Sequence, residues 1–263
     1  MELQLRDKTA FVSGSTGGIG LAVAEMLADE GARVIVNGRT RRTVDSTVAD
    51  LTNRYPGAAH DGIVADFADP DSVERLSGEL GEVDILVNNV GLFGLAQFES
   101  IADEEWARYL EVNLMSGVRL SRQALPGMLE RGWGRIVFVS SESGVNIPAD
   151  MIHYGVTKAA MIALGNGLAK RTRGTGVTVN TVLGGPTYSH GVAAAIESVA
   201  SAQSSSAEAV KQSIISQNHT TLLERFIEPT EIASLVTYLA SPRSSATNGA
   251  AVRADGGVLT GVL

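Results

Sequence analysis

The chain has 263 residues, of which 44% are hydrophobic and 19% are charged, so it can bury a sizeable core and has too few charges for disorder. Its net charge of -8 opposes contact with nucleic-acid phosphates and anionic lipid surfaces, and the absence of cysteine excludes disulfides, thiolate metal ligands and cysteine nucleophiles. We therefore expect a globular protein with no nucleic-acid or membrane partner. Residues 1–8 carry charges where a signal peptide needs an apolar run, so we expect the protein to be cytoplasmic.

Short, β-branched apolar runs alternate with longer helical patterns along the chain, which is typical of βαβ units in a parallel sheet. No linker divides this alternation, so we expect one domain over residues 1–263, with a doubly wound α/β fold and a seven-stranded parallel sheet flanked by helices on both faces. The predicted strands are 9–13, 33–37, 62–66, 85–88, 135–140, 178–182 and 250–253, and the predicted helices are 18–30, 41–55, 69–80, 103–131, 153–173 and 229–239.

Residues 189–223 interrupt the alternation of strands and helices. They follow a Gly-Gly-Pro break and are rich in alanine and serine. Long connections of this kind are usually functional or disordered. We therefore expect one or two short helices here that form a lid over the substrate.

A glycine-rich loop follows the first predicted strand and opens the next helix. Glycines allow a tight turn and a close approach of the backbone to a pyrophosphate, while the helix N-terminus offers free N–H groups. The alternative is a flexible turn, which the strand-to-helix context disfavours. The pattern predicts a dinucleotide site, whose residues in this loop are Gly14, Ser15, Thr16, Gly18, Ile19 and Gly20.

The ends of the second and third predicted strands are placed to meet the adenosine of a dinucleotide. The second strand is followed by Gly38 and Arg39 where an acidic residue would select a ribose hydroxyl. A guanidinium favours a 2′-phosphate, so we expect NADP(H), with NAD(H) as the alternative cofactor. Asp66 and Phe67, at the end of the third strand, are candidates to hold the adenine, although an ordinary turn explains them almost as well.

Tyr154 and Lys158 stand four residues apart on a predicted helix, so their side chains share one face. A neighbouring ammonium lowers the pKa of a phenol, as general acid–base chemistry near neutral pH requires. This spacing also arises by chance on helices. Ser140 and Ser141 end the preceding strand, where ligands of open parallel sheets bind, and strand alternation turns Ser140 away from the side that Ser141 faces.

Together these residues resemble the motifs of the short-chain dehydrogenase/reductase family, in its simple single-domain branch. The resemblance covers essentially all 263 residues and implies a Rossmann-like fold with oxidoreductase activity. One departure is Gly184, where the family commonly has proline, and we expect a looser segment there. The motifs are the glycine loop, Asn88-Asn89-Val90-Gly91, Asn113, Ser141, Tyr154 and Lys158.

The resemblance also implies a role for each catalytic residue. Ser141 orients and polarises the substrate oxygen, and Tyr154 passes the proton. Lys158 lowers the pKa of Tyr154 and binds the nicotinamide ribose, while Asn113 anchors a water that relays protons from Lys158. Further cofactor contacts are expected from Asn89, Val90, Gly91, Pro186, Thr187 and Ser189.

We expect hydride transfer between a nicotinamide cofactor and a ketone or secondary alcohol, and favour an NADPH-preferring carbonyl reductase. The alternatives are a 3-oxoacyl-acyl-carrier-protein reductase and, more remotely, a dinucleotide-binding scaffold without turnover. No metal is expected, because no two of the four histidines stand at ligand spacing. The candidate substrate-lining residues are Leu92, Phe93, Glu142, Met151, Tyr188 and His190.

Two of the predicted helices lead us to expect self-association. The helix predicted over 153–173 is rich in alanine and glycine, and with the helix predicted over 103–131 it resembles the family's dimer interface. We therefore expect a homotetramer or homodimer through these helices, the alternative being a helix trimmed only for internal packing.

Overall fold

The computed structural model describes residues 2–217 and 221–262, without the side chains of residues 190, 194, 195, 198 and 217. Seven parallel strands form one sheet in the order β3-β2-β1-β4-β5-β6-β7. The doubly wound prediction is confirmed, with strand ends that differ from the predicted ones by at most two residues. The strands are β1 (Thr9–Val12), β2 (Arg33–Gly38), β3 (Asp61–Val64), β4 (Ile85–Asn88), β5 (Trp133–Ser141), β6 (Gly176–Gly184) and β7 (Ala251–Ala254).

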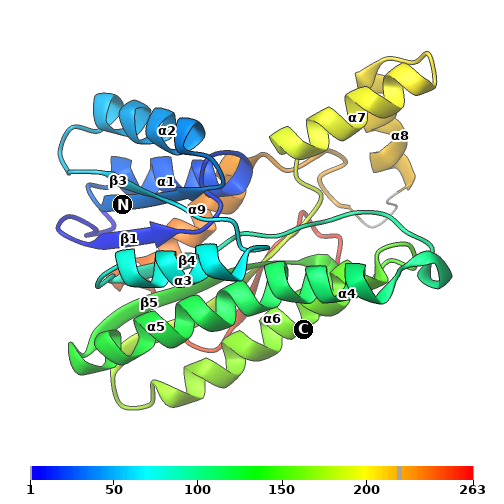
Figure 1. The fold of residues 1–263 in the computed structure, drawn as a ribbon. Coiled ribbons are helices and arrows are strands. Elements are labelled where there is room, and N and C mark those ends of the chain that lie inside the picture. Colours follow the sequence, from blue (N-terminus) through cyan, green and yellow to red (C-terminus); the bar gives the residue numbers. More distant parts are fainter. Residues whose placement is uncertain (1, 218–220, 263) are drawn as a thin grey trace.

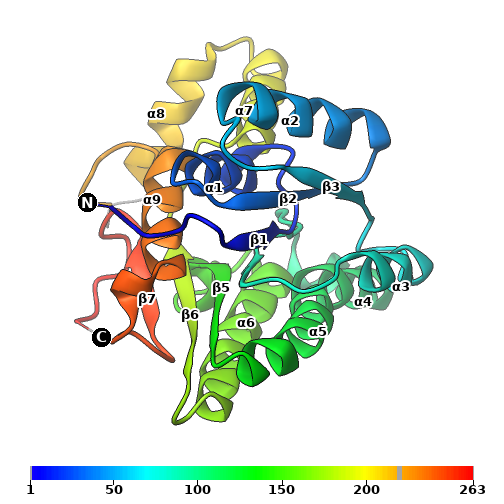
Figure 2. The ribbon, with the colours of Figure 1, turned by 90° about the vertical axis from the view of Figure 1, so that its left-hand side faces the viewer.

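Two layers of helices cover the sheet, because each helix buries one apolar stripe against the strands (Figures 1 and 2). Helices α1, α2 and α9 pack on one face, and α3, α5 and α6 pack on the other. The α-helices are α1 (Gly18–Asp29), α2 (Arg41–Arg54), α3 (Pro70–Glu79), α4 (Asp103–Tyr109), α5 (Ser116–Glu130), α6 (Ile152–Arg171), α7 (His190–Ala202), α8 (Ala207–Gln217) and α9 (Pro229–Ala240).

The segment predicted as one helix over 103–131 contains a π-helical stretch, η2 (Leu110–Met115), between α4 and α5. The side chain of Asn113, inside this stretch, is fully buried. It bonds the backbone of Leu92 on both sides, accepting from its N–H at 2.6 Å and donating to its carbonyl at 2.9 Å. This tie to the chain after β4 gives a local reason for the wider turn, and such turns often mark functional sites.

The sheet changes its winding direction at β1, which has β2 on one side and β4 on the other. Ligands of open α/β sheets bind beyond the carboxyl ends of the strands at this place. Helices α7 and α8 lie beyond these ends, outside the two layers (Figure 1). They share a small apolar cluster, which includes Ile196, Ala200, Val210 and Phe226. Within the described residues, none of the helices has both the length and the apolar character needed to cross a membrane.

Candidate active site

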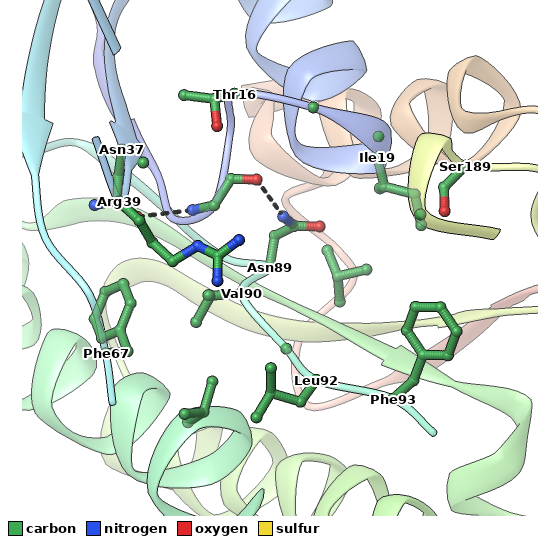
Figure 3. A pocket seen from close by; sticks show the side chains of 18 of the residues that line it. Thr16, Ile19, Asn37, Arg39, Phe67, Asn89, Val90, Leu92, Phe93 and Ser189 are labelled. Carbon is green, nitrogen blue, oxygen red and sulfur yellow. Dashed lines mark hydrogen bonds between the residues drawn. The ribbon is translucent and has the colours of Figure 1, made fainter. Parts of the chain in front are cut away.

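A cavity of about 940 Å³ lies at the carboxyl ends of β1, β2, β4 and β5. The loop after β1 and the start of α1 form one wall, and the segments after β3 and β4 form another (Figure 3). Helix α6 contributes Tyr154 and Lys158, and the segment before α7 contributes Ser189. The other predicted cofactor and substrate residues that line it are Gly14, Thr16, Gly18, Ile19, Arg39, Asp66, Phe67, Asn89, Val90, Gly91, Leu92 and Phe93.

The glycine loop is held from two sides. Gly14 has a φ of 63°, a conformation that favours glycine, and its N–H donates to the Asn37 side chain at 2.9 Å. The Asn89 amide donates to the Gly14 carbonyl at 3.1 Å (Figure 3). A methyl group on Gly20 would overlap that carbonyl, so only glycine fits there. Gly17, the N-cap of α1, has no side chain to bond the first-turn N–H groups, which leaves them available to a pyrophosphate.

Two serines beside this loop serve the backbone. The hydroxyl of Ser13 accepts from the N–H groups of Asn89 at 2.9 Å and Val90 at 3.1 Å. The hydroxyl of Ser15 donates to the Val12 carbonyl at 2.7 Å. Ser15 and Gly20 are absent from the residues lining the cavity, so they shape the loop rather than face a ligand. Asn37, which does line the cavity, was not predicted, although an amide at a strand end is a common backbone anchor.

The part of the cavity beside the end of β2 carries a positive charge, Arg39. Arg39 is exposed and extends into the cavity (Figure 3). Arg41, nearby, pairs with Asp45 at 3.5 Å, whereas Arg39 forms no ion pair with the residues that the structure describes. Phe67 is buried at the cavity wall, and one Asp66 oxygen accepts from the Ala68 N–H at 3.0 Å. Arg39 is therefore free to meet an anionic group.

The opposite end brings the predicted catalytic residues together. Ser141 and Tyr154 share a hydrogen bond. The Lys158 ammonium lies 5.6 Å from the centre of the Tyr154 ring and donates to the Val139 carbonyl at 2.9 Å. Ser140 is among the residues that line the cavity, whereas Ser141 is not, and the Ser140 hydroxyl donates to the Lys158 carbonyl at 2.9 Å. This group can bind an oxygen through two hydroxyls and hold a cation beside the phenol.

Burial dominates the electrostatics of this group. Burial raises the pKa of Tyr154 to about 12. The hydrogen bond with Ser141 lowers this pKa, and the negative charge of Glu142 raises it by a smaller amount. Burial also lowers the pKa of Lys158 to about 8. The expected lowering of the Tyr154 pKa by Lys158 is not found, because desolvation of the phenolate outweighs the other contributions. At neutral pH the site therefore presents a neutral phenol and an ammonium.

Asn113 is expected to anchor a water, and in this structure its side chain bonds three groups of the protein. Besides its two bonds to Leu92, its amide donates to the Thr157 hydroxyl at 3.0 Å, and that hydroxyl donates to the Tyr154 carbonyl at 2.7 Å. The side chain of Asn113 thus connects η2, the chain after β4 and the helix that carries Tyr154. Thr157 was not predicted, because nothing in the sequence distinguishes it from a helical surface residue.

The predicted substrate residues lie in different parts of the structure. Leu92 and Phe93 line the cavity, whereas Glu142, which begins a 3₁₀ turn after Ser141, and Met151, which precedes α6, lie outside its lining. Tyr188 packs on Phe226 with ring centres 5.8 Å apart, in the apolar cluster of α7 and α8, and not in the cavity. The side chain of His190 lies outside the described residues.

Pro186 and Thr187 are also absent from the cavity lining. The Pro186 carbonyl accepts from the Ile227 N–H at 2.8 Å, and the Thr187 hydroxyl donates to the Gly185 carbonyl at 2.8 Å. Both residues are therefore held by the protein's own backbone in this structure. Their predicted contacts with the cofactor stay predictions.

Comparison with known proteins decides the family. The model of the short chain dehydrogenase family matches residues 8–200. The chain belongs to the short chain dehydrogenase family. An uncharacterized oxidoreductase of Bacillus subtilis, YvrD, is 44% identical, over 98% of this chain and 99% of its own. The 3-oxoacyl-acyl-carrier-protein reductase of Vibrio cholerae is 33% identical, over 97% and 99%. L-sorbose reductase from Gluconobacter frateurii, in complex with NADPH and L-sorbose, superposes with a TM-score of 0.93 at 30% identity, over 100% of both chains.

As a short chain dehydrogenase, the protein is an NAD(P)-dependent oxidoreductase that acts on an alcohol or a carbonyl. Its departure from the family pattern at Gly184 leaves the sheet intact. Gly184 ends β6 and pairs with Ser141 on one side and Ala254 on the other. Both neighbouring strands pair with Gly184, and the expected looseness of the segment stays a prediction.

Proposed function

We propose that this protein is an NADPH-preferring carbonyl reductase that converts a ketone into a secondary alcohol. One observation carries the proposal: a single cavity has Arg39, which forms no ion pair with the described residues, at one end and Tyr154 with Lys158 at the other. A dinucleotide with a 2′-phosphate would extend between these two ends.

The residues present fit such a dinucleotide. The tight turn at Gly14, the uncapped first turn of α1 and the exclusion of any side chain at Gly20 make room for a pyrophosphate against the backbone. Arg39 would bond the 2′-phosphate, and Lys158 the nicotinamide ribose. When bound, the reduced dinucleotide supplies the hydride.

The protein's own groups handle the oxygen of the substrate. Ser141 and Tyr154 are hydrogen-bonded to each other, so one carbonyl oxygen can bind both hydroxyls. As the carbonyl carbon gains the hydride, its oxygen takes the proton of Tyr154, and the ketone becomes a secondary alcohol while the dinucleotide is oxidised. Lys158 stabilises the phenolate that Tyr154 then carries, until a solvent proton restores the phenol.

A preference for NADPH over NADH is supported by Arg39 and by the structural similarity to a reductase that is complexed with NADPH. A guanidinium bonds a phosphate through two N–H groups, and it gains much less from a ribose hydroxyl. The preference therefore depends on this one side chain more than on the shape of the pocket.

A 3-oxoacyl-acyl-carrier-protein reductase is the second candidate, favoured by the 33% identity with the Vibrio cholerae enzyme. The net charge of -8 is unfavourable for an acidic carrier protein. An assay of NADPH oxidation with a panel of small ketones and an acetoacetyl thioester separates the two. We expect the ketones to be reduced with the higher kcat/KM, and a strong preference for the thioester would replace this proposal with the second candidate.

Self-association and a lid complete the proposal. Among the described residues, η2 and α6 each carry one exposed large apolar side chain, Leu110 (37% exposed) and Val156 (38% exposed). Burial of these two side chains favours a homotetramer or homodimer through these helices. Residues 189–223 act as the lid, since α7 and α8 lie beyond the strand ends. Light scattering tests the assembly, and a monomeric mass contradicts it.

A further inference from the structure

Two apolar side chains, Leu92 and Phe93, line the cavity on the segment that follows β4. Phe93 is 50% exposed, although phenylalanine is usually buried. Its ring lies on the same side of the cavity as Ser189 (Figure 3). An aromatic surface that borders a cavity gains free energy when an apolar group of a ligand covers it.

Two contacts place Phe93 beside the start of α6. Two residues before it, a Cβ atom on Gly91 would lie 3.5 Å from the Lys158 ammonium. Three residues after it, the Ala96 N–H donates to the Asp150 carbonyl at 2.8 Å, just before α6 begins. The segment that carries Phe93 therefore runs along the first turns of α6, the turns that carry the catalytic phenol.

Helix α7 borders the Phe93 ring from the other side of the cavity. A Cβ atom on Gly191, in the first turn of α7, would lie 3.8 Å from Cε1 of the ring. Gly191 and Ser189 both line the cavity. Because Gly191 has no side chain to cover the ring, Phe93 stays half-exposed between the starts of α6 and α7.

The charges of the cavity lining lie elsewhere or are already engaged. Within the described residues, the charged residues of the lining are Arg39, Asp66, Arg108 and Lys158. The first two follow β2 and β3, which are separated from β4 by β1 in the sheet. Arg108 pairs with Glu105 at 3.0 Å, and Lys158 donates to the Val139 carbonyl at 2.9 Å. The lining beside Phe93 therefore favours an apolar substituent over an ionic one.

We propose that Phe93 selects ketones that carry an apolar group, such as a phenyl ring, on a short chain beside the carbonyl, by packing against that group while Tyr154 holds the carbonyl oxygen. The inference rests on the proposed ketone reduction and names its substrate class. The contact is remote from the reacting atoms and is kept in the transition state, so it lowers KM and leaves kcat nearly unchanged.

Butanone and benzylacetone form a matched pair for the test, since benzylacetone is butanone with a phenyl group on the end of its ethyl chain. Packing of a phenyl group on an aromatic ring is worth about 10- to 100-fold, so the wild type should reduce benzylacetone with a kcat/KM higher by about that factor. In Phe93→Ala most of this ratio should be lost, through a higher KM for benzylacetone. Phe93→Leu keeps an apolar surface, so it should retain part of the ratio.

Phe98→Ala is the matched control. Phe98 begins the 3₁₀ turn Phe98–Ser100 on the same connection, and it is 54% exposed, but it lies outside the cavity lining. Its replacement by alanine should leave the ratio of the two kcat/KM values unchanged. Exposure of an aromatic ring alone therefore does not produce the expected effect.

The outcomes separate the two proposals. A ratio near one in the wild type overturns the role of Phe93 while leaving ketone reduction in place. Equal losses with both ketones in Phe93→Ala assign the ring to the seating of α7 and also overturn that role. A higher kcat/KM for L-sorbose than for benzylacetone overturns it as well, because that substrate is a polyhydroxy ketone. No NADPH oxidation with any carbonyl overturns the proposed function, and this inference with it.

Discussion

The Lys158 ammonium lies 5.6 Å from the centre of the Tyr154 ring, and the two groups have pKa values near 8 and 12. Both shifts have the same main cause, since burial disfavours each charged form. In the proposed reaction, the neutral phenol of Tyr154 gives a proton at neutral pH, and the Lys158 cation stabilises the phenolate that forms.

This relationship predicts opposite pH dependences for the two directions of the reaction. Reduction needs the Tyr154 phenol and the Lys158 ammonium, so its kcat should be flat up to about pH 8 and fall above it. Oxidation of the alcohol needs the phenolate, whose fraction rises about tenfold per pH unit below its pKa of about 12. Steady-state rates in both directions from about pH 6 to about pH 10 test this. An oxidation rate that does not change over this range contradicts it.

The buried ammonium predicts a stability cost. The pKa of Lys158 is about 8 in the folded protein and 10.5 ordinarily. Holding the ammonium charged therefore costs more free energy in the folded state than in the unfolded chain. The cost is fully present below about pH 8 and disappears as the pH rises toward the unfolded value. Lys158→Met should be inactive, yet more stable than the wild type at about pH 7, by up to about 3 kcal/mol. Urea unfolding measures this, with the exposed Lys170→Met as control.

In the same experiment the difference in unfolding free energy between Lys158→Met and the wild type should decrease between about pH 8 and about pH 10. A Lys158→Met protein that is less stable than the wild type at neutral pH would show that the bond to Val139 outweighs the desolvation.

Two glycines predict contrasting responses to alanine. A methyl group on Gly20 would overlap the Gly14 carbonyl and the Asn89 amide, so Gly20→Ala should cost about 1–3 kcal/mol and weaken NADPH binding. At Gly184 a methyl group would meet only Ile232 at 3.6 Å and the Ser140 carbonyl at 3.7 Å. Gly184→Ala should therefore gain about 0.4–1 kcal/mol, because it restricts the unfolded chain. Urea unfolding measures the stability of both variants, and NADPH fluorescence titration measures their affinity for the cofactor. Equal losses of stability in the two variants would contradict this prediction.

Arg39 predicts the cofactor preference. Arg39→Ala should raise KM for NADPH about 10- to 100-fold and leave KM for NADH nearly unchanged, since only the former carries the phosphate. Arg41→Ala removes a cation that already pairs with Asp45 and should change neither value much. Equal Michaelis constants for the two cofactors in the wild type rule out the assignment.

The fold and the candidate catalytic residues were predictable because both depend on local patterns. Alternating strands and helices define the sheet, and Ser141, Tyr154 and Lys158 are recognised by their order and spacing. The position of Tyr188 was not predictable, because its contact with Phe226 joins segments far apart in the chain. The raised pKa of Tyr154 was missed for a similar reason, since burial is a property of the whole fold. The π-helical turn at Asn113 depends on a bond to Leu92, which spacing along a helix does not reveal.

The most direct test of the central claim is the rate of NADPH-dependent ketone reduction by Tyr154→Phe, which removes one hydroxyl and keeps the ring. Single-turnover rates with saturating NADPH isolate the chemical step, and NADPH fluorescence shows that the variant still binds the cofactor. If Tyr154 donates the proton, the rate should fall by about 10²- to 10⁴-fold while the affinity for NADPH stays within a few-fold of the wild type. A variant that reduces ketones at the wild-type rate would falsify the assignment of Tyr154 as the proton donor.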